Sequence, residues 1–371
     1  NSSGTVQWEM RYDGPGNYHD VAYSIAVDKN KNVYVTGGSS GVGGTTRYDY
    51  ATIKYSSGGS ELWVARYNHN DFNDTANEIV IDDSDNIYVT GSSDGTSLGI
   101  PNYATIKYSS AGNELWVSRY TGGGGGDEAR AIFINGSNNI YVTGQSKNTS
   151  SPNNYDYLTI NYNAATGDTV WTARYNGPDD DADIATSIAS DLSGNLYVTG
   201  FSKGNGTSYD YTTLKYNSIG EQQWVISYDG KGNGNDIANT VALDNIGNIY
   251  IAGSSVGNGT SDDIVTLKYS QVATDVNESQ IGLPNNYIFH QNYPNPFNPS
   301  TIIRYSIPQT SSVIIKVYDA LANEIQALIN EEKNPGIYSV NFDGSNLASG
   351  IYFYRIQAGN FIETKKMLLL K

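Results

Sequence analysis

The sequence predicts an all-β protein: a five-bladed β-propeller closed by its N-terminal strand, followed by a small antiparallel β-sandwich domain. One strand-like segment occurs five times, and all five tryptophans lie 53 or 55 residues apart. A period of about 50 residues that contains only strand patterns is typical of propellers. The five copies are KNVYVTGGS at 31–39, DNIYVTGSS at 85–93, NNIYVTGQS at 138–146, GNLYVTGFS at 194–202 and GNIYIAGSS at 247–255.

Composition supports the same fold class. The chain has 40 glycines and 31 tyrosines but no cysteine, which is typical of a turn-rich, aromatic β-protein. Each repeat contains four strand patterns, and several of these strands are apolar on both faces. A sheet that is apolar on both faces needs cover on both, and blades stacked around an axis provide it. In the first repeat the strands are expected at 23–28, 32–39, 50–55 and 62–67.

The two ends of the repeat region predict how the ring closes. The segment VQWEMRY at 6–12 matches the last strand of a repeat, but no repeat precedes it. The fifth repeat stops at IVTLKYS, residues 264–270, and lacks a last strand. We therefore expect residues 6–12 to pair with residues 264–270 as the outermost strand of the fifth blade, which leaves no long unpaired edge.

The composition changes after residue 270. A polar linker is followed by a Pro/Asn-rich segment and by strands that alternate as in a small sandwich. The predicted organisation is a five-bladed propeller at 1–270, a linker at 271–284 and an Ig-like β-sandwich at 285–371, with strands at 313–319, 336–344, 350–359 and 363–371.

Charge and hydropathy exclude several classes of protein. The formal net charge is −16, and such a surface repels phosphate backbones, so nucleic-acid binding is not expected. No run of 18 apolar residues occurs, which argues against a membrane span. The first residues, NSSGTVQWEM, lack the basic and apolar regions of an export signal and are interpreted as a mature end.

The sequence contains no convincing catalytic motif. His19, His69 and His290 share no repeat position and have no metal-ligand spacing. No G-x-S-x-G elbow is present, and the chain has no cysteine nucleophile. We therefore predict that the protein is not an enzyme and that it needs no organic cofactor.

Two aspartate series follow the repeat. Members of the first stand two residues before a repeated alanine, where five carboxylates could ring one mouth of the channel and bind a cation such as Ca²⁺ or a polar ligand. The alternative is that each one caps a turn within its own blade. The first series is Asp20, Asp74, Asp127, Asp183 and Asp236; the second, interpreted as hairpin-turn residues, is Asp28, Asp82, Asn135, Asp191 and Asp244.

Other side chains are weaker candidates. Tyrosines in a YDY pattern could contact glycans or form an interface, although tyrosine is an ordinary strand residue and its propensity favours packing. Two Asp-Thr-Ala/Val triplets resemble short bacterial O-glycosylation sites, which gives Thr75 and Thr169 as candidates. The tyrosines are Tyr48, Tyr50, Tyr155, Tyr157, Tyr209 and Tyr211.

The chain also resembles two known families. Residues 6–270, with the repeated pattern A-x-(S)-I-A-x-D-x-x-G-N-x-Y-V-T-G, resemble the SBBP-type β-propeller repeat of secreted bacterial proteins. Residues 285–371 resemble the type A sorting domain of the type IX secretion system of Bacteroidetes and their relatives. Three motifs carry that resemblance: NYPNPFNPST at 292–301, FDGSNLASGIYFYRI at 342–356 and KKMLLLK at 365–371.

The resemblance to the sorting domain implies export by the type IX pathway to the cell surface or extracellular space, with residues 285–371 as the part read by the secretion machinery. One departure is DALANE at 319–324, where the family usually has glycine near Leu321–Ala322. We expect the turn to form there with some strain.

Three classes of function remain. The favoured one is a non-enzymatic surface or matrix protein with a structural or adhesive role, which could form filaments through its propeller and C-terminal domain. The alternative is a glycan-binding lectin that uses the variable loops at 40–49, 93–102, 146–155, 202–209 and 255–262. A secreted glycoside hydrolase is disfavoured, because the repeated carboxylates offer no pair in distinct environments.

Overall fold

The computed structural model describes residues 4–41, 47–95, 99–123, 126–135, 139–147, 154–179, 181–191, 193–204, 208–232, 234–244, 247–270, 287–292 and 295–370. The regular elements in these ranges are all β-strands, so the predicted all-β class is confirmed. No helix that could cross a membrane occurs in these ranges. The chain divides into two compact units, Asn1–Gln271 and Val272–Lys371. The predicted linker at 271–284 lies outside the described residues.

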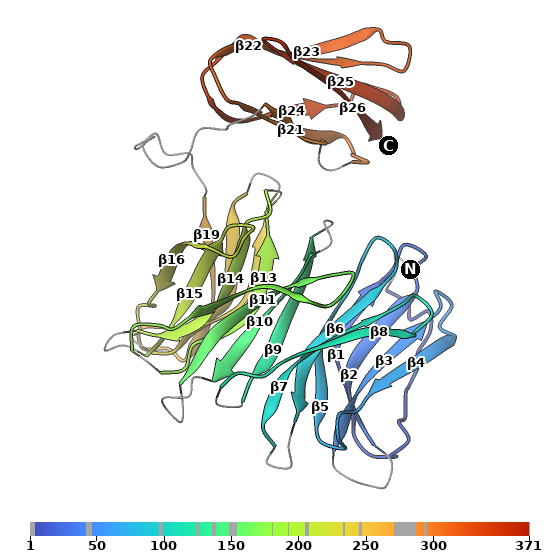
Figure 1. The fold of residues 1–371 in the computed structure, drawn as a ribbon, viewed down its shortest axis with the longest axis vertical. Helices are drawn as coiled ribbons and strands as arrows, with labels where there is room; N and C mark the ends of the chain where they lie inside the picture. Colours follow the sequence, from blue (N-terminus) through green and yellow to red (C-terminus); the bar gives the residue numbers. More distant parts are fainter. Residues whose placement is uncertain are drawn as a thin grey trace. The chain divides into compact units, whose positions relative to one another are not determined.

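The first unit is a succession of antiparallel sheets, each made of strands consecutive in the chain (Figure 1). Strands of each sheet contact those of the next. The sheets are the first, β1 (Asp20–Val27), β2 (Val33–Ser40), β3 (Tyr48–Tyr55) and β4 (Glu61–Tyr67); the second, β5 (Asp74–Ile81), β6 (Ile87–Asp94), β7 (Pro101–Tyr108) and β8 (Glu114–Tyr120); the third, β9 (Glu128–Asn135), β10 (Asn139–Lys147), β11 (Tyr155–Asn163) and β12 (Thr169–Tyr175); the fourth, β13 (Ile184–Ser190), β14 (Leu196–Lys203), β15 (Tyr209–Tyr216) and β16 (Gln222–Tyr228); and the fifth, β17 (Asp236–Leu243), β18 (Ile249–Val256) and β19 (Asp262–Tyr269).

The turn between the first two strands of a sheet is built by one aspartate side chain. In the first sheet, Asp28 Oδ1 accepts the N–H groups of Asn30 and Asn32 at 2.9 and 2.8 Å. Its Oδ2 accepts the Tyr34 hydroxyl at 3.0 Å. These bonds fix an Asx-type turn, so the interpretation of the four aspartates of the second series as turn residues is confirmed, whereas the turn after Asn135 lies outside the described residues. Corresponding bonds are made by Asp82, Asp191 and Asp244.

Successive sheets pack through two repeated contacts. Tyr50 on β3 donates its hydroxyl to the Ala104 carbonyl of the next sheet at 3.1 Å. Trp63 on β4 donates Nε1–H to the Ser110 carbonyl of the next sheet at 3.2 Å, and its ring covers Gly112. Gly112 has a φ of +84°, and a Cβ there would lie 2.8 Å from the ring, so this close approach requires glycine. The same contacts are made by Tyr103, Tyr157, Tyr211, Trp116 and Trp171.

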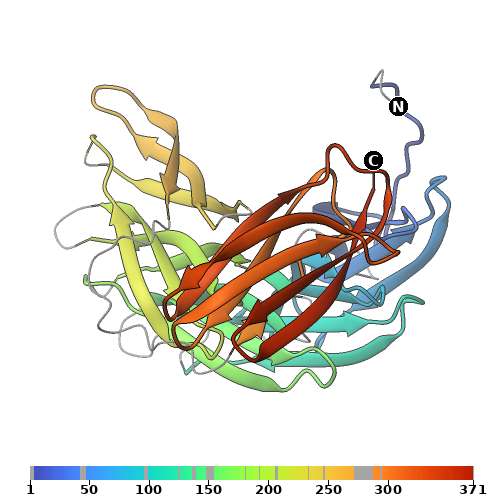
Figure 2. The same ribbon diagram turned by 90° about the horizontal axis from the view of Figure 1, so that it is seen from above.

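The predicted pairing of the N-terminal strand with the fifth sheet is not present in the structure. Within the described ranges, β19 pairs with β18 only, and residues 4–14 form no strand. The first and fifth sheets lie at the two ends of an open arc (Figure 2). Residues 8–12 lie against the first sheet instead. Trp8 covers Gly59 there and donates Nε1–H to the Ser57 carbonyl at 3.2 Å.

The second unit consists of two antiparallel sheets that enclose one core. Apolar side chains from both sheets meet in it, including Ile303, Val317, Phe342 and Ile356. In chain order the strands are β20 (Ile288–Phe289), β21 (Ser300–Ile307), β22 (Ser311–Tyr318), β23 (Glu324–Lys333), β24 (Gly336–Asp343), β25 (Gly350–Ala358) and β26 (Phe361–Leu369), and the sheet orders are β20-β21-β24 and β23-β22-β25-β26.

The turn between β22 and β23 forms despite the missing glycine. Ala322 has a φ of 65°, in the left-handed region. That conformation costs a residue with a Cβ roughly 1–2 kcal/mol. Asp319 offsets part of this strain, since its Oδ1 accepts the N–H groups of Leu321 and Asn323, both at 2.9 Å. The predicted strained turn is therefore present.

Candidate functional site

Each aspartate of the predicted ring binds the loop that precedes its own sheet. Asp74 Oδ2 accepts the His69 N–H at 2.7 Å, and Asp74 Oδ1 accepts the Ser93 hydroxyl. These contacts are those of the alternative interpretation, in which each aspartate serves its own blade, and the ligand ring stays a prediction. Asp20, Asp127, Asp183 and Asp236 accept the corresponding glycine N–H groups at 2.9, 2.6, 2.5 and 2.5 Å.

Burial changes the acidity of two of these carboxyl groups. Asp74 is 0% exposed and Asp183 is 1% exposed. Burial raises the pKa of Asp74 to about 6, although the Ser93 hydroxyl and the His69 N–H stabilise its charged form. Burial likewise raises the pKa of Asp183 to about 6. Both groups therefore titrate close to neutral pH, because water is excluded from their charged forms.

The structure also shows an arginine at the end of the fourth strand, which the sequence analysis missed. In the first sheet, Arg66 Nη2 lies 2.7 Å from Asp49 Oδ2, and Arg66 Nη1 lies 2.7 Å from Ser39 Oγ. In the third sheet, Arg174 Nη1 lies 2.8 Å from Asp156 Oδ2. The arginine at the end of the fourth strand thus forms an ion pair with an aspartate at the start of the third strand.

The second sheet keeps the arginine but changes its partner. Arg119 donates to the Ser93 hydroxyl at 2.5 Å and to the Tyr67 hydroxyl of the preceding sheet at 2.8 Å. Asn102 replaces the aspartate there. The sequence signal was the recurring end of the fourth strand, LWVARY, LWVSRY and VWTARY, each following an Asp or Asn of the third strand. We use the name polar layer for the carboxylates of Asp49, Asp74, Asp156 and Asp183 together with Ser39, Ser93, Arg66, Arg119 and Arg174.

Half of the tyrosines proposed for glycan or interface contacts are buried between sheets. Tyr50, Tyr157 and Tyr211 are at most 1% exposed and donate to carbonyl groups of the next sheet. A surface role for these three is therefore wrong, because their hydroxyl groups are used in packing. Their neighbours remain candidates, since part of each side chain reaches the surface: Tyr48, Tyr155 and Tyr209.

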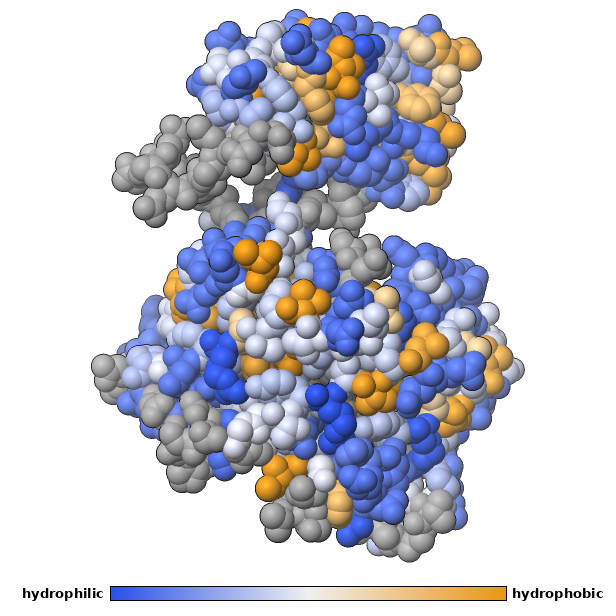
Figure 3. All heavy atoms as spheres, viewed as in Figure 1, coloured by the Kyte–Doolittle hydropathy of each residue, from blue (hydrophilic) through white to orange (hydrophobic). Residues whose placement is uncertain are grey.

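The remaining candidates are dispersed. Thr169 is exposed and Thr75 is half-buried, and their glycosylation stays a prediction. His19 and His69 precede different sheets, and His290 belongs to the second unit. Parts of the variable loops, at 42–46, 96–98, 148–153 and 205–207, lie outside the described residues. On the face seen in Figure 3, the first unit is mostly hydrophilic, with apolar residues in small groups.

One apolar groove, of about 250 Å³, lies on the first sheet. Its lining includes Trp8, Ile25 and Val35. Ile25 on β1 is 66% exposed, although the residues at the same position of the other four sheets are almost fully buried. The first sheet is therefore uncovered where every later sheet is covered by the sheet before it. Those four residues are Ile79, Ile132, Ile188 and Val241, which are 3, 3, 7 and 6% exposed.

Comparisons with known families confirm the two resemblances. Residues 291–370 match the secretion system C-terminal sorting domain, and residues 11–43 and 62–99 match the beta-propeller repeat. The sorting domain indicates export by type IX secretion to the cell surface or extracellular space and implies contact with the secretion machinery, so the predicted localisation is confirmed. No curated protein gives a significant match.

Several solved structures are similar to the chain. PorZ, a surface component of the type-IX secretion system of Porphyromonas gingivalis, is 15% identical with a TM-score of 0.41; the match covers 98% of this chain and 47% of PorZ, so the chain spans about half of its length. An α-L-arabinanase of Penicillium chrysogenum is 9% identical, with a TM-score of 0.46 and coverage of 91% and 97%. The β-propeller domain of the Trilobed protease from Pyrococcus furiosus, which has an open velcro topology, is 9% identical, with a TM-score of 0.41 and coverage of 94% and 96%.

Proposed function

We propose that this exported propeller protein is not an enzyme and has a structural or adhesive role at the cell surface or in the extracellular matrix. The polar layer is the observation that supports this proposal. Its carboxylates are bound by arginine, serine or backbone N–H groups of the same chain, and Asp49, Asp74, Asp156 and Asp183 are at most 7% exposed. A glycosidase needs two carboxyl groups that reach the same sugar. These four side chains are too deeply buried to do so.

A rigid block of this kind acts through contacts with its neighbours, and we propose that copies associate through propeller and sorting domain. Contacts between unlike surfaces that do not close on themselves produce filaments. The test is sedimentation velocity and electron microscopy of the full chain at increasing concentration, together with a screen against polysaccharide substrates. We expect assemblies and no hydrolysis. Monomers at every concentration would contradict the assembly, and released sugar would contradict the non-enzymatic role.

We further propose that the propeller closes as a ring of five blades, with residues 6–12 as the fourth strand of the fifth blade. The contacts of this segment support the assignment. Trp8 contacts Gly59 of the first sheet as Trp63 contacts Gly112 of the second. Tyr12 accepts a hydrogen bond from Arg66 at 3.0 Å. Tyr67 accepts the same bond from Arg119 at 2.8 Å. Residues 8–12 thus make the contacts that a fourth strand makes with the following sheet.

The ends of the arc also match each other. The groove on the first sheet exposes the apolar positions that a preceding blade covers elsewhere in the unit. At the other end, β19 presents Ile264, which is 90% exposed. Burial of such surface is worth roughly 25 cal/mol per Å², so covering both faces favours closure. In the register of β3 and β4, closure places Met10 opposite Thr266, as Ala65 stands opposite Thr52. It also places Arg11 near Asp263, as Arg66 lies near Asp49.

A pair of cysteines tests this register, because the chain contains none of its own. With Met10→Cys and Thr266→Cys, mild oxidation is expected to give a disulfide within one monomer, seen by mass spectrometry and non-reducing electrophoresis. The matched control, Met10→Cys with Val265→Cys, puts the second cysteine on the other face of β19 and is expected to stay reduced. Disulfide-linked dimers, or no disulfide in the first pair, would contradict closure within the chain.

A further inference from the structure

The polar layer changes at the boundary between the fourth and fifth sheets. The position held by Arg66, Arg119 and Arg174 in the first three sheets is Ser227 in the fourth. Ser227 carries no charge, and its hydroxyl lies 3.3 Å from the hydroxyl of Thr212. The aspartate that faces the arginine in the first and third sheets is nevertheless kept, as Asp210 on β15. The fourth sheet therefore keeps the aspartate of this pair and has serine at the arginine position.

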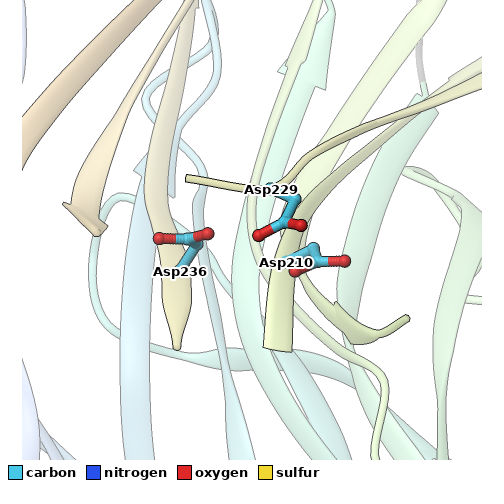
Figure 4. Close-up of side chains that lie close together, drawn as sticks. All are labelled: Asp210, Asp229 and Asp236. Carbon is cyan, nitrogen blue, oxygen red and sulfur yellow. The ribbon is translucent and has the colours of Figure 1, made fainter. Parts of the chain in front are cut away.

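Three carboxylates gather where that arginine is missing. Asp210 lies on β15, Asp229 follows β16 directly, and Asp236 opens β17 of the fifth sheet. One oxygen of each lies within 4.8 Å of the others. Figure 4 shows the Asp229 carboxylate placed between the other two. Asp210 is 6% exposed and Asp236 is 0% exposed, whereas Asp229 is exposed to solvent.

A second observation points to a ligand at this cluster. Asp236 Oδ2 accepts the Gly230 N–H, but Asp236 Oδ1 is buried and has no hydrogen-bond partner. The equivalent Oδ1 atoms of Asp74 and Asp127 are satisfied by the Ser93 hydroxyl and the Lys147 N–H, whereas that of Asp20 is also buried without a partner. A buried carboxylate oxygen without a partner is costly and requires a compensating group. Asp236 stands beside two further carboxylates, and a cation is the kind of group that compensates such a cluster.

We propose that Asp210, Asp229 and Asp236 bind one calcium ion, which takes the place of the arginine of the first three sheets. Calcium binds carboxylate oxygens at about 2.3–2.6 Å, so two ligands on opposite sides of one ion lie about 5 Å apart. The separation within this cluster, up to 4.8 Å, fits that geometry. The exposed Asp229 gives the ion access from solvent, and water completes the coordination. Extracellular calcium sites bind with dissociation constants of about 10⁻⁴–10⁻³ M.

This site differs from the ring of five equivalent aspartates considered in the sequence analysis. It is a single site at one blade boundary, made by three carboxylates of which Asp236 alone belongs to that series. The proposal is independent of ring closure and of the adhesive role, because its ligands come from the fourth and fifth sheets only.

Calorimetric titration of the full chain with CaCl2, after treatment with EDTA, tests the proposal. We expect one bound ion with a dissociation constant of about 10⁻⁴–10⁻³ M, and a higher melting temperature in 10-fold excess over that value. Ser227→Arg restores the arginine and is expected to abolish calcium binding and to remove the melting-temperature response. Asp229→Asn is expected to weaken binding at least about tenfold, since one of three charged ligands is lost. The control Asp168→Asn, at an exposed position away from the cluster, is expected to bind as the wild type does.

Two results would overturn the proposal. The first is the absence of both binding heat and a melting-temperature response in the wild-type chain at 10 mM calcium. The second is calcium binding that Asp229→Asn leaves unchanged. Asp229 is exposed, so its replacement does not disturb the core, and it decides the question even where Ser227→Arg prevents folding.

Discussion

Replacement of Trp8 with alanine gives a quantitative test of the role assigned to the N-terminal segment. Trp8 is half-buried, covers Gly59 and donates one hydrogen bond to Ser57. Removing a buried tryptophan side chain costs about 3–5 kcal/mol, and a lost hydrogen bond is included in that range. Because the ring is only partly covered, we expect a loss near the lower end, about 3 kcal/mol of unfolding free energy.

The matched variant is Trp116→Ala. Trp116 is half-buried, covers Gly167 and donates to Ala164 at the same distance, 3.2 Å, as Trp8 does to Ser57. Trp116 lies on a strand that is paired within its sheet, so its replacement is expected to lower the unfolding free energy by the full amount. Urea unfolding of the full chain, followed by far-UV circular dichroism, measures both variants. For a slope of about 3 kcal/mol per M, a loss of 3 kcal/mol lowers the midpoint by about 1 M.

Equal shifts in the two variants are expected if residues 6–12 form an integral strand of the propeller. A shift of about 1 M for Trp116→Ala combined with less than about 0.3 M for Trp8→Ala would refute that reasoning. Such a result would mean that residues 6–12 contribute little to the unfolding free energy and can detach from the first sheet at little cost in free energy.

Three further predictions concern the joints, the buried acids and the arginines. Gly112→Ala is expected to lower the unfolding free energy by at least about 2 kcal/mol, from its left-handed φ and from displacement of Trp63. Gly58→Ala, where the added Cβ would make only an ordinary contact 3.9 Å from Ser56 Oγ, is expected to change the urea midpoint little. The pKa values of Asp74 and Asp183 are raised by burial from 3.8 to about 6, so their stabilising contribution is complete below pH 3.8 and is lost as pH rises through 6. Asp183→Asn, measured against wild type at pH 4 and pH 7, should therefore gain on the order of 3 kcal/mol more at pH 7, and an equal difference at both pH values would contradict the shift. Arg174→Met leaves Asp156, whose side chain is 0% exposed, without its cation and is expected to cost about 3–5 kcal/mol, whereas Lys29→Met at an exposed ion pair is expected to cost less than about 1 kcal/mol.

Local chemistry made part of the fold readable from the sequence. The turn aspartates, represented by Asp28, were predicted because an Asx turn depends on a few neighbouring residues. The repeat of Trp63 and its equivalents was visible because the first three joints between sheets use the same side chain. Closure of the ring is predicted from the matching end segments, but the pairing itself also depends on the summed rotation of all the sheets and not only on a local pattern.

Burial within strands was harder to predict. Tyr50 and Tyr48 alternate along β3, but both faces of the sheet are apolar, so alternation did not indicate which tyrosine is buried. The carboxylate cluster was missed because its signal is an absence: Ser227 stands where three other repeats have arginine. Comparing the repeats column by column would have revealed it, and would have separated Asp236 from the other members of its series.

The contact of tryptophan with glycine described between successive sheets has a consequence for the history of the chain. The three joints that use it share the same tryptophan, glycine and hydrogen bond to a carbonyl, which favours the exchange of one unit for another. A gene segment that encodes one whole sheet can thus be duplicated or deleted without a new kind of joint. In a closed ring, residues 6–12 and the fifth sheet must still pair with each other.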